Sequence, residues 1–428
     1  MIYENWLFSG SLEARGGSCP PLSSSIKTDC LVIGGGFAGL HAALRLIESG
    51  KKVVLLEKGI CGSSSSGQSG GFLTPESEED LRELIEKYGK EKARLIYKIP
   101  SEGVNLILKT AKKNNFRCDL RRQDTLYLSI KKSHNKFIYE EKETREEMGL
   151  PYKMLNQKEL KEVHPGKGYK VGLKYPGSYG INSFSYTQEL KSLLFKKGVK
   201  IYEGSEVDKI VNNTALTHLG SVRADNIIVC IDKMKKEFNK DLSDEYYHIQ
   251  SYLAVSEPLS KEEVKSIFPD GELMCWDTKL SYSHYRLVGN NRLMVGGSSF
   301  LTAYLPKHYL SPSVINSFIR EIKFRFPKLK DVKFQYYWGG LIDVTRDLTP
   351  IADYDAKNKR IQYAMGCAGL PWAAWCGDYL ARRIIDKNGT EDLSEFLKID
   401  REYFLSHGFQ RFFGKIITFG INHLKQFI

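Results

Sequence analysis

A glycine-rich turn near the start of the chain is the feature that most restricts its fold. An apolar segment, residues 30–33, runs into Gly34, Gly36 and Gly39, which occupy the three glycine positions of GxGxxG. The first glycine permits a tight turn, the second lets the backbone approach a diphosphate, and the third lets the next helix pack on the strand. A helical segment with one apolar face and a second apolar strand, residues 53–56, follow. This order predicts a strand, turn, helix and strand that bind a dinucleotide.

An acidic residue stands where a dinucleotide site needs one. Glu57 closes the second strand, 18 residues after Gly39, and a carboxylate there accepts hydrogen bonds from ribose hydroxyls. Phe37 and Ala38 at the helix start, and Lys58 beside the acid, are further expected contacts. GxGxxG occurs once, whereas a flavoenzyme that also uses a pyridine nucleotide usually has two such motifs. We therefore expect one dinucleotide domain.

Composition and charge restrict the class of protein further. With 428 residues, 42% of them hydrophobic and 27% charged, the chain is long enough for two sub-domains with a sizeable core. The net charge of +12 comes from scattered lysines rather than from one basic stripe, which disfavours a nucleic acid as partner. The eight cysteines form no CxxC pair and no metal-ligand spacing, which predicts reduced thiols in a cytosolic protein and no bound metal.

Neither end of the sequence predicts secretion or a membrane span. The first residues lack a basic segment followed by an apolar one, and no apolar run approaches the ~20 residues that a bilayer requires. We therefore expect a cytoplasmic protein. Residues 401–428 carry apolar side chains at helical spacing, which predicts an amphipathic helix. This helix either packs on its own domain, the more common arrangement, or lies peripherally on a membrane.

The loop after Glu57 carries the first of four matches to one protein family. Residues 57–72, EKGICGSSSSGQSGGF, resemble the glycine-rich loop of the D-amino-acid oxidase and glycine oxidase superfamily of FAD enzymes. Residues 175–210, 338–353 and 363–385 are similar to three further segments of that superfamily. The resemblance implies an FAD cofactor. It implies cofactor contacts at Ser65, Ser66, Gly67, Gly71, Phe72, Val207, Gly340, Gly366, Gly369, Leu370 and Pro371.

The resemblance also implies a fold. This is an α/β fold with a Rossmann-like FAD-binding domain of the GR2 type and a discontinuous α+β substrate domain that contains a mostly antiparallel sheet. Asn290 and Asn291, between two strand-like runs, predict a hairpin turn in that sheet. The expected segments are 1–25 for an N-terminal extension, 26–100, 176–235 and 336–400 for the FAD-binding domain, and 101–175 and 236–335 for the substrate domain.

The reaction that the resemblance implies is an oxidation beside a nitrogen atom. Members of the superfamily move a hydride from the carbon next to the nitrogen of an amine or amino acid to flavin N5, and the imine then hydrolyses. Because the flavin carries the bond breaking, we assign no catalytic side chain. His41 lies in the nucleotide helix and His284 in a strand pattern, and we expect both to be structural.

Three residues are candidates for contact with the substrate. Glycine-oxidase-like members hold the substrate α-carboxylate with an arginine in segment 338–353, whereas this chain has Ile342 followed by Asp343. Asp343 can attract a cationic amine, and the pattern is nearer to the γ-glutamylputrescine-oxidoreductase-like branch. Arg286 either binds a substrate carboxylate or pairs with a surface acid. Trp372 either walls the pocket opposite the flavin or packs in the core.

Two absences bear on the cofactor and the electron acceptor. The cysteine and the histidine that attach flavin covalently in sarcosine-oxidase-like and dimethylglycine-dehydrogenase-like relatives are missing, so we expect non-covalent FAD. Met294 replaces a lysine that helps sarcosine-oxidase-like enzymes react with oxygen, which favours a quinone or carrier over O2. We expect a monomer or homodimer. Two alternative functions stay open: oxidation of an aminomethyl group on a tRNA base, and a flavin-binding partner protein without catalysis.

Overall fold

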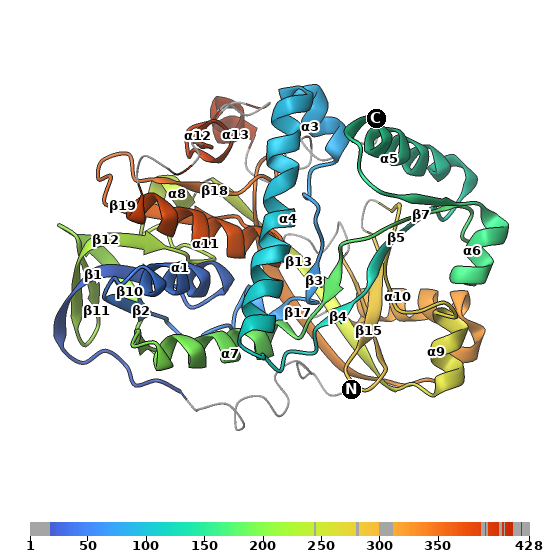
Figure 1. Cartoon of the computed structure of the whole chain (residues 1–428), viewed down its shortest axis with the longest axis horizontal. Helices are drawn as coiled ribbons and strands as arrows, with labels where there is room; N and C mark the ends of the chain where they lie inside the picture. The colour runs from blue at the N-terminus through green and yellow to red at the C-terminus, as the bar shows by residue number, and fades with distance from the viewer. Residues whose placement is uncertain are drawn as a thin grey trace.

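Two large β-sheets lie side by side, each in a lobe with its own helices (Figure 1). The computed structural model describes residues 18–243, 245–279, 282–298, 311–386, 390, 393–401, 405, 407–413 and 421. Each sheet is assembled from segments that are far apart in the sequence, so the chain passes repeatedly between the lobes. This arrangement confirms the α/β fold with a discontinuous second domain.

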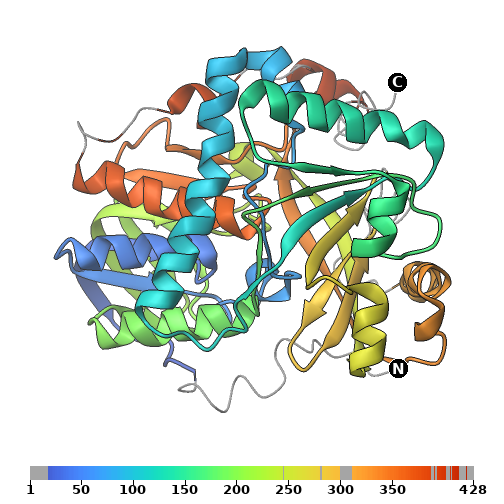
Figure 2. The same ribbon diagram turned by 45° about the vertical axis from the view of Figure 1, so that its right-hand side comes forward.

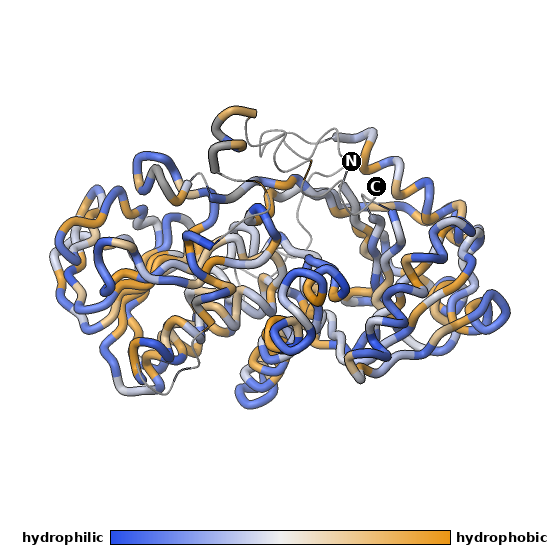
Figure 3. The backbone as a smooth tube through the Cα atoms, turned by 90° about the horizontal axis from the view of Figure 1, so that it is seen from above, coloured by the Kyte–Doolittle hydropathy of each residue, from blue (hydrophilic) through white to orange (hydrophobic). Residues whose placement is uncertain are grey.

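The first sheet contains the strand that precedes the glycine turn. Its central strand, β1 (Ser25–Ile33), pairs in parallel with β2 (Val53–Leu56) and with β12 (Ser221–Val229). All of β2 is buried, as expected for a parallel strand covered on both faces, and hydrophobic residues run along the strands of this lobe in Figure 3. The path is β10-β11-β12-β1-β2-β9, with β19 beside β12 and β18 beside β19. The other strands are β9 (Lys200–Tyr202), β10 (Val207–Val211), β11 (Thr214–Thr217), β18 (Ile351–Tyr354) and β19 (Ile361–Met365).

Closely packed helices cover this sheet. Helix α1 (Phe37–Glu48) lies against α11 (Leu370–Ile385), and a Cβ added at Gly377 of α11 would lie 1.9 Å from the carbonyl oxygen of Ala38. A glycine is therefore required at this crossing. The long helix α4 (Lys90–Lys113) stands between the two lobes in Figure 1 and also packs on α11. Helix α7 (Ser183–Lys196) contacts α1.

The second sheet forms the other lobe and is flanked by helices of its own (Figure 2). Its order is β17-β13-β16-β15-β14-β5-β7-β6, and neighbouring strands are antiparallel except for β14 and β5. This confirms the expected mostly antiparallel sheet. The strands are β5 (Asp124–Leu128), β6 (Lys153–Leu155), β7 (Gly172–Tyr175), β13 (Tyr246–Pro258), β14 (Leu273–Asp277), β15 (His284–Val288), β16 (Arg292–Gly297) and β17 (Phe334–Thr345). The helices are α5 (Asn135–Met148), α6 (Gln157–Val163), α9 (Lys261–Ile267) and α10 (Pro312–Arg325).

Short elements complete the described chain. A small sheet joins β3 (Phe72–Leu73), β8 (Tyr179–Gly180) and β4 (Arg121–Arg122). No described helix is both long enough and apolar enough to cross a bilayer, and the described His, Cys, Asp and Glu residues form no group that could hold a metal ion. The short helices are α2 (Ser65–Gln68), α3 (Leu81–Tyr88), α8 (Lys240–Ser243), α12 (Ser394–Leu397), α13 (His407–Phe413) and the 3-10 turns Lys132–His134 and Pro327–Leu329.

The hairpin between β15 and β16 has the predicted turn. Asn290 and Asn291 have φ angles of 57° and 54°, and the two strands pair antiparallel on either side of them. Asparagine tolerates this left-handed conformation better than most side chains, and two such residues form the turn that matches the twist of a hairpin.

Two expected domain boundaries differ from the observed sheets. Segment 336–345 belongs to β17, which pairs along its length with β13 in the antiparallel sheet, so the chain rejoins the nucleotide sheet only at β18. Helix α4 runs without a break through the expected boundary at residue 100. The remaining domain assignments stay predictions. Residues 1–17 and most of the expected C-terminal helix, 401–428, lie outside the described residues.

Candidate cofactor and substrate site

A cavity of about 1010 Å³ extends from the nucleotide sheet to the antiparallel sheet. One end is lined by residues that follow β1, β2 and β12, at the carboxyl ends of neighbouring parallel strands. Ligands of open α/β sheets bind at this edge. The cavity continues past residues 62–71, which we call the serine–glycine loop, and past β17 toward the second lobe.

Each glycine of the GxGxxG turn has a close neighbour, which is main chain at Gly34 and Gly39 and a side chain at Gly36. Gly34 has a φ of +105°, and a Cβ there would lie 2.1 Å from the carbonyl oxygen of Cys230. A Cβ at Gly36 would lie 2.9 Å from Ser66 Oγ, and one at Gly39 would lie 1.9 Å from the Gly34 carbonyl oxygen. Gly34 and Gly36 line the cavity, whereas Gly39 lets α1 pack on β1. The backbone at the start of α1 is thus open to an anionic ligand.

The carboxylate of Glu57 sits at the end of β2 on the cavity wall. Its Oε2 accepts a hydrogen bond from Gly35 N–H (2.7 Å), and its Oε1 accepts one from Gly59 N–H (2.8 Å). Burial raises the pKa of Glu57, and these two hydrogen bonds oppose that shift. Because each oxygen can accept a second hydrogen bond, Glu57 can still bind a ribose hydroxyl.

Three hydrogen bonds tie the serine–glycine loop to α1 and β17 in the cavity wall. Ser66 Oγ accepts from Phe37 N–H at the start of α1 (3.0 Å), and Ser65 Oγ donates to the Leu341 carbonyl of β17 (2.8 Å). Trp338 Nε1 donates to the carbonyl of Gln68 (3.0 Å). The run of serines is therefore an ordered part of the site, not a flexible linker.

The other glycine loop lies at the amino terminus of α11. Gly366 and Gly369 have φ angles of +61° and +91°, which most side chains disfavour. Both line the cavity, together with Leu370 at the first turn of the helix and Gly340 of β17. A helix amino terminus directed at a cavity favours a partial negative charge there. This loop therefore suits the flavin end of the cofactor.

Most of the expected cofactor residues line the cavity. Those that do are Gly34, Gly36, Phe37, Ala38, Glu57, Lys58, Ser65, Ser66, Phe72, Val207, Gly340, Gly366, Gly369 and Leu370. Gly39, Gly67, Gly71 and Pro371 lie behind the wall. The last three are packed against main chain. A Cβ added at Gly67 would lie 2.1 Å from the Gly62 carbonyl oxygen, and one at Gly71 would lie 1.9 Å from that of Ile181. The carbonyl oxygen of Pro371 itself lies 2.1 Å from where a Cβ at Gly103 of α4 would be. These four residues do not line the cavity, and their direct contact with the cofactor stays a prediction.

The position of Arg286 corrects its expected contact with a substrate carboxylate. Its side chain is fully buried and does not line the cavity. Its Nε donates to the Gly70 carbonyl (2.9 Å) and its Nη2 to the Ile181 carbonyl (2.7 Å). Burial lowers the pKa of Arg286 to about 10. Because main-chain carbonyls already use its donors, Arg286 holds the serine–glycine loop in place.

Asp343 and Trp372 also point away from the cavity, contrary to expectation. Successive side chains of a strand face opposite sides, so Ile342 lines the cavity, 39% exposed, while Asp343 is buried behind it. The Asp343 carboxylate accepts hydrogen bonds from Lys233 N–H (2.5 Å) and His248 Nδ1–H (2.6 Å). Trp372 is 2% exposed in the core of the first lobe, so its packing role holds.

The end of the cavity in the second lobe is acidic. Burial raises the pKa of Glu76 to about 7 although Arg145 lies beside it, and burial together with neighbouring carboxylates raises the pKa of Asp80 to about 7. Aromatic rings line this end of the cavity together with the acids. We call this end the acidic chamber, lined by Glu76, Glu78, Asp80, Glu141 and Asp277 together with Tyr127, Trp276, Tyr282 and Lys279.

Some of these carboxylates are paired and two are not. Arg145 binds Glu76 (3.0 Å) and Glu141 (2.7 Å). Asp277 pairs with Lys279 (3.3 Å). In the described chain, no lysine, arginine or histidine nitrogen lies within 4 Å of the carboxylates of Glu78 or Asp80. Above about pH 7, where Asp80 is ionised, the chamber therefore has negative charge without a paired cation in contact with the cavity.

Aromatic side chains connect the serine–glycine loop with the acidic chamber. The ring of Phe72 meets His284 edge-on at 5.2 Å between centroids, and His284 lies 5.8 Å from Tyr282. Burial lowers the pKa of His284 to about 4, so its imidazole is neutral at neutral pH. His284 lines the cavity, which sequence reasoning did not anticipate, but a neutral side chain adds no charge to the wall.

Sequence reasoning also missed Asp232 and Lys233, which line the cavity directly after β12. They carry no motif. The general rule that ligands bind at the carboxyl ends of parallel strands would have located them, had β12 been assigned as the neighbour of β1. The acidic chamber had no comparable signal, because its residues come from segments 76–80, 127, 141 and 276–282.

A model of the DAO family, described as FAD dependent oxidoreductase, matches residues 29–383. The chain belongs to this family. Its cofactor is FAD, as the resemblance implied. The glycine-lined start of α1 fits the diphosphate, and Glu57 fits the adenosine ribose.

Individual relatives agree with this assignment. The chain is 28% identical over 399 residues to probable oxidoreductase OrdL of Haemophilus influenzae, covering 90% of this chain and 89% of that one. It is 27% identical over 361 residues to γ-glutamylputrescine oxidoreductase of Escherichia coli, covering 81% of each. The expected branch of the superfamily is thus confirmed.

Solved structures share the fold of this oxidoreductase. Glycine oxidase from Geobacillus kaustophilus superposes with a TM-score of 0.72 at 17% identity, covering 88% of this chain and 100% of that one. L-proline dehydrogenase from P. horikoshii superposes with a TM-score of 0.71 at 19% identity, covering 87% and 97%. At these identities the likeness concerns the fold alone.

Proposed function

We propose that this oxidoreductase oxidises an amine that carries a second cationic group, at the carbon next to one of its nitrogens. The observation that supports the proposal is the charge of the cavity wall. Five carboxylates line the acidic chamber, and no arginine lines any part of the cavity among the described residues. A guanidinium is the usual partner of a substrate α-carboxylate. The wall therefore favours a cationic amine over a simple α-amino acid.

Different side chains along the cavity contact different parts of the substrate. Ile342, Leu341 and Trp338 give an apolar wall beside the serine–glycine loop, which desolvates the carbon that reacts. The carboxylates of Glu78 and Asp80 attract the distal ammonium, and the nearby aromatic rings offer cation–π contacts. Bound FAD supplies the hydride acceptor. We further propose that FAD is held non-covalently and that O2 or a quinone reoxidises it.

Anaerobic reduction of the bound flavin tests this function. The holoenzyme is mixed with a diamine, a monoamine of equal chain length, an N-methyl amine and a D-amino acid, and bleaching of the oxidised flavin absorbance is timed. We expect the diamine to reduce the flavin fastest. Faster reduction by the D-amino acid would contradict the proposal, and flavin that stays with acid-precipitated protein would contradict non-covalent binding.

Removal of the unpaired chamber charges should weaken diamine binding. For the double substitution Glu78→Gln and Asp80→Asn, we expect KM for the diamine to rise about tenfold or more, because each charged contact contributes about 1.5–3 kcal/mol, with kcat little changed. The matched control is Asp208→Asn, which removes a carboxylate from the nucleotide end of the same cavity. An equal rise in KM for the monoamine would show that the acidic chamber does not bind the second cationic group of the diamine.

The acidic chamber also predicts a pH dependence. The pKa values of Glu76 and Asp80 are raised to about 7, so these carboxyls are protonated below pH 7 and charged above it. We expect KM for the diamine to fall as the pH rises from 6 to 8. KM for the monoamine over the same range serves as the control, since its binding does not need the distal charge.

A further inference from the structure

A lysine ammonium sits in the wall of the cofactor cavity beside two serines. The side chain of Lys233 is 15% exposed, and its Nζ donates to Ser64 Oγ (3.1 Å) and Ser65 Oγ (3.0 Å). The Asp232 carboxylate lies 3.8 Å away, beyond hydrogen-bond distance. A buried charge is costly unless it is paired and hydrogen-bonded. Lys233 Nζ thus has two neutral hydrogen-bond partners and one carboxylate at ion-pair distance, and it lies on the wall of the cavity.

The backbone of Lys233 is held in an unusual conformation that directs the side chain into the cavity. Its φ is +55°, in the left-handed region that a lysine seldom adopts. The buried Asp343 carboxylate accepts the Lys233 N–H (2.5 Å), and the other carboxylate oxygen accepts from His248. Asp343, which we first assigned to substrate binding, thus positions the residue that carries Nζ. Strained backbone maintained by its surroundings is common at ligand sites.

The location of Nζ identifies the anion. Ser64 and Ser65 immediately precede Ser66, whose Oγ accepts from Phe37 N–H at the amino terminus of α1. The FAD diphosphate binds at this terminus in a GxGxxG site. Ser65 gives its own proton to the Leu341 carbonyl (2.8 Å), whereas no described acceptor takes the proton of Ser64. One Lys233 N–H and the Ser64 hydroxyl are therefore available to a phosphate oxygen.

We propose that Lys233 binds the diphosphate of FAD, together with the hydroxyl of Ser64. Lysine is a compact cation that pairs well with phosphate as a point charge. The glycine turn provides main-chain donors and the dipole of α1, and Lys233 adds a full positive charge from the segment after β12, which carries no motif. This inference concerns the cofactor and does not depend on which substrate is oxidised.

Titration of the FAD-free protein with FAD, ADP and adenosine tests the proposal, with affinity followed by flavin fluorescence and by calorimetry. The substitution Lys233→Met removes the charge but keeps the β-carbon. The conformational cost of a positive φ at this position is therefore the same in both proteins. We expect the Kd for FAD and for ADP to rise about tenfold, and that for adenosine, which lacks phosphate, to change less than twofold. Lys233→Arg should restore most of the affinity.

The control is Lys235→Met, which removes a lysine that lines the same cavity but is 64% exposed and paired with Glu206 (2.7 Å). We expect this variant to bind FAD within twofold of the parent. An unchanged Kd for FAD in Lys233→Met would overturn the proposal. So would a loss of FAD affinity without a loss of ADP affinity, because Nζ would then face the flavin half. Thermal unfolding of the FAD-free variants shows that each is folded.

Discussion

Replacing Gly34 with alanine is expected to abolish stoichiometric FAD binding, with an affinity loss of about 100-fold or more. The alanine would adopt a φ of +105°, and its Cβ would lie 2.1 Å from the carbonyl oxygen of Cys230. Main chain cannot move aside as a flexible side chain can, so β1 and β12 would have to separate at the diphosphate site. The ratio of flavin absorbance to protein after gel filtration measures the result.

Gly50 offers a matched control for this substitution. Its φ is +83°, also in the left-handed region, but a Cβ added there meets nothing within 4 Å. Gly50→Ala therefore has the conformational cost of about 1 kcal/mol without the steric clash. We expect it to bind FAD like the parent. If Gly34→Ala also kept a full complement of FAD, the account of the glycine turn would be wrong.

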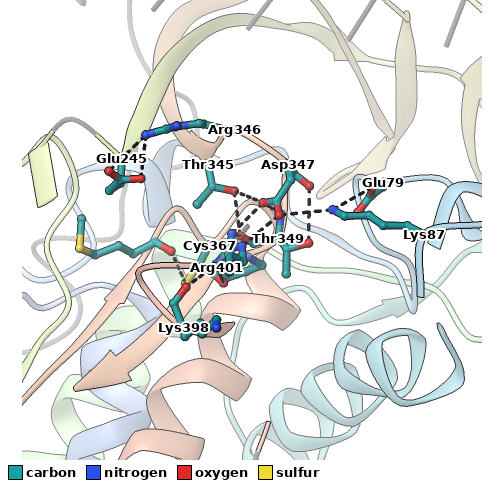
Figure 4. A network of polar contacts seen from close by, with 12 residues as sticks. Glu79, Lys87, Glu245, Thr345, Arg346, Asp347, Thr349, Cys367, Lys398 and Arg401 are labelled. Atoms are coloured by element: carbon teal, nitrogen blue, oxygen red, sulfur yellow. Dashed lines mark hydrogen bonds and ion pairs between the residues drawn. The ribbon is translucent and has the colours of Figure 1, made fainter. Parts of the chain in front are cut away.

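Arg401→Met is expected to lower the free energy of unfolding by about 3 kcal/mol, the lower end of the cost of breaking a buried ion pair. The substitution removes the nearest cation of the buried Asp347 carboxylate and leaves it only Lys87, at 3.5 Å. Arg401 Nη2 and Nε bind Asp347 Oδ1 (2.7 Å) and Oδ2 (2.9 Å), and both side chains are largely buried. Figure 4 shows this pair at the centre of a network in which Lys87 and Thr345 also reach Asp347. The network ties segment 398–401 to the loop after β17, and denaturant unfolding measures its contribution.

The same pair predicts how stability varies with pH. Burial by itself would raise the pKa of Asp347, but the guanidinium of Arg401 and its hydrogen bonds lower it to about 2, below the ordinary value of about 3.9 in an unfolded chain. The pair's contribution is therefore complete above about pH 4 and is lost as the pH falls toward 2. The stability difference between parent and Arg401→Met should shrink over that range.

An exposed ion pair provides the comparison for Arg401. Arg82 contacts Glu86 (3.1 Å), and both side chains are more than half exposed. Such pairs contribute about 0–1 kcal/mol, so Arg82→Met should leave the unfolding free energy nearly unchanged. An equally small effect of Arg401→Met would show that the buried network does not hold the C-terminal segment.

The amino-acid sequence by itself determined the nucleotide half of this oxidoreductase. Gly34 could be assigned because its positive φ and its closeness to other main chain depend on the missing Cβ, a property of the residue itself. The turn at Asn290 and Asn291 could be assigned for a similar local reason. Four family-like segments in the expected order then gave the FAD cofactor and the two-lobed α/β fold, both of which are confirmed.

Only the tertiary structure decided which side chains face the cavity. Asp343 and Ile342 are neighbours on β17, and the pairing of that strand turns Ile342 inward and Asp343 toward Lys233. In the sequence Arg286 is as good a candidate for substrate binding, but in the structure it is buried and donates its hydrogen bonds to main-chain carbonyls. The acidic chamber is assembled from segments separated by up to two hundred residues. The role of a carboxylate in the chamber depends on neighbours that folding brings together. These neighbours are distant in the sequence, so no local sequence pattern predicts them.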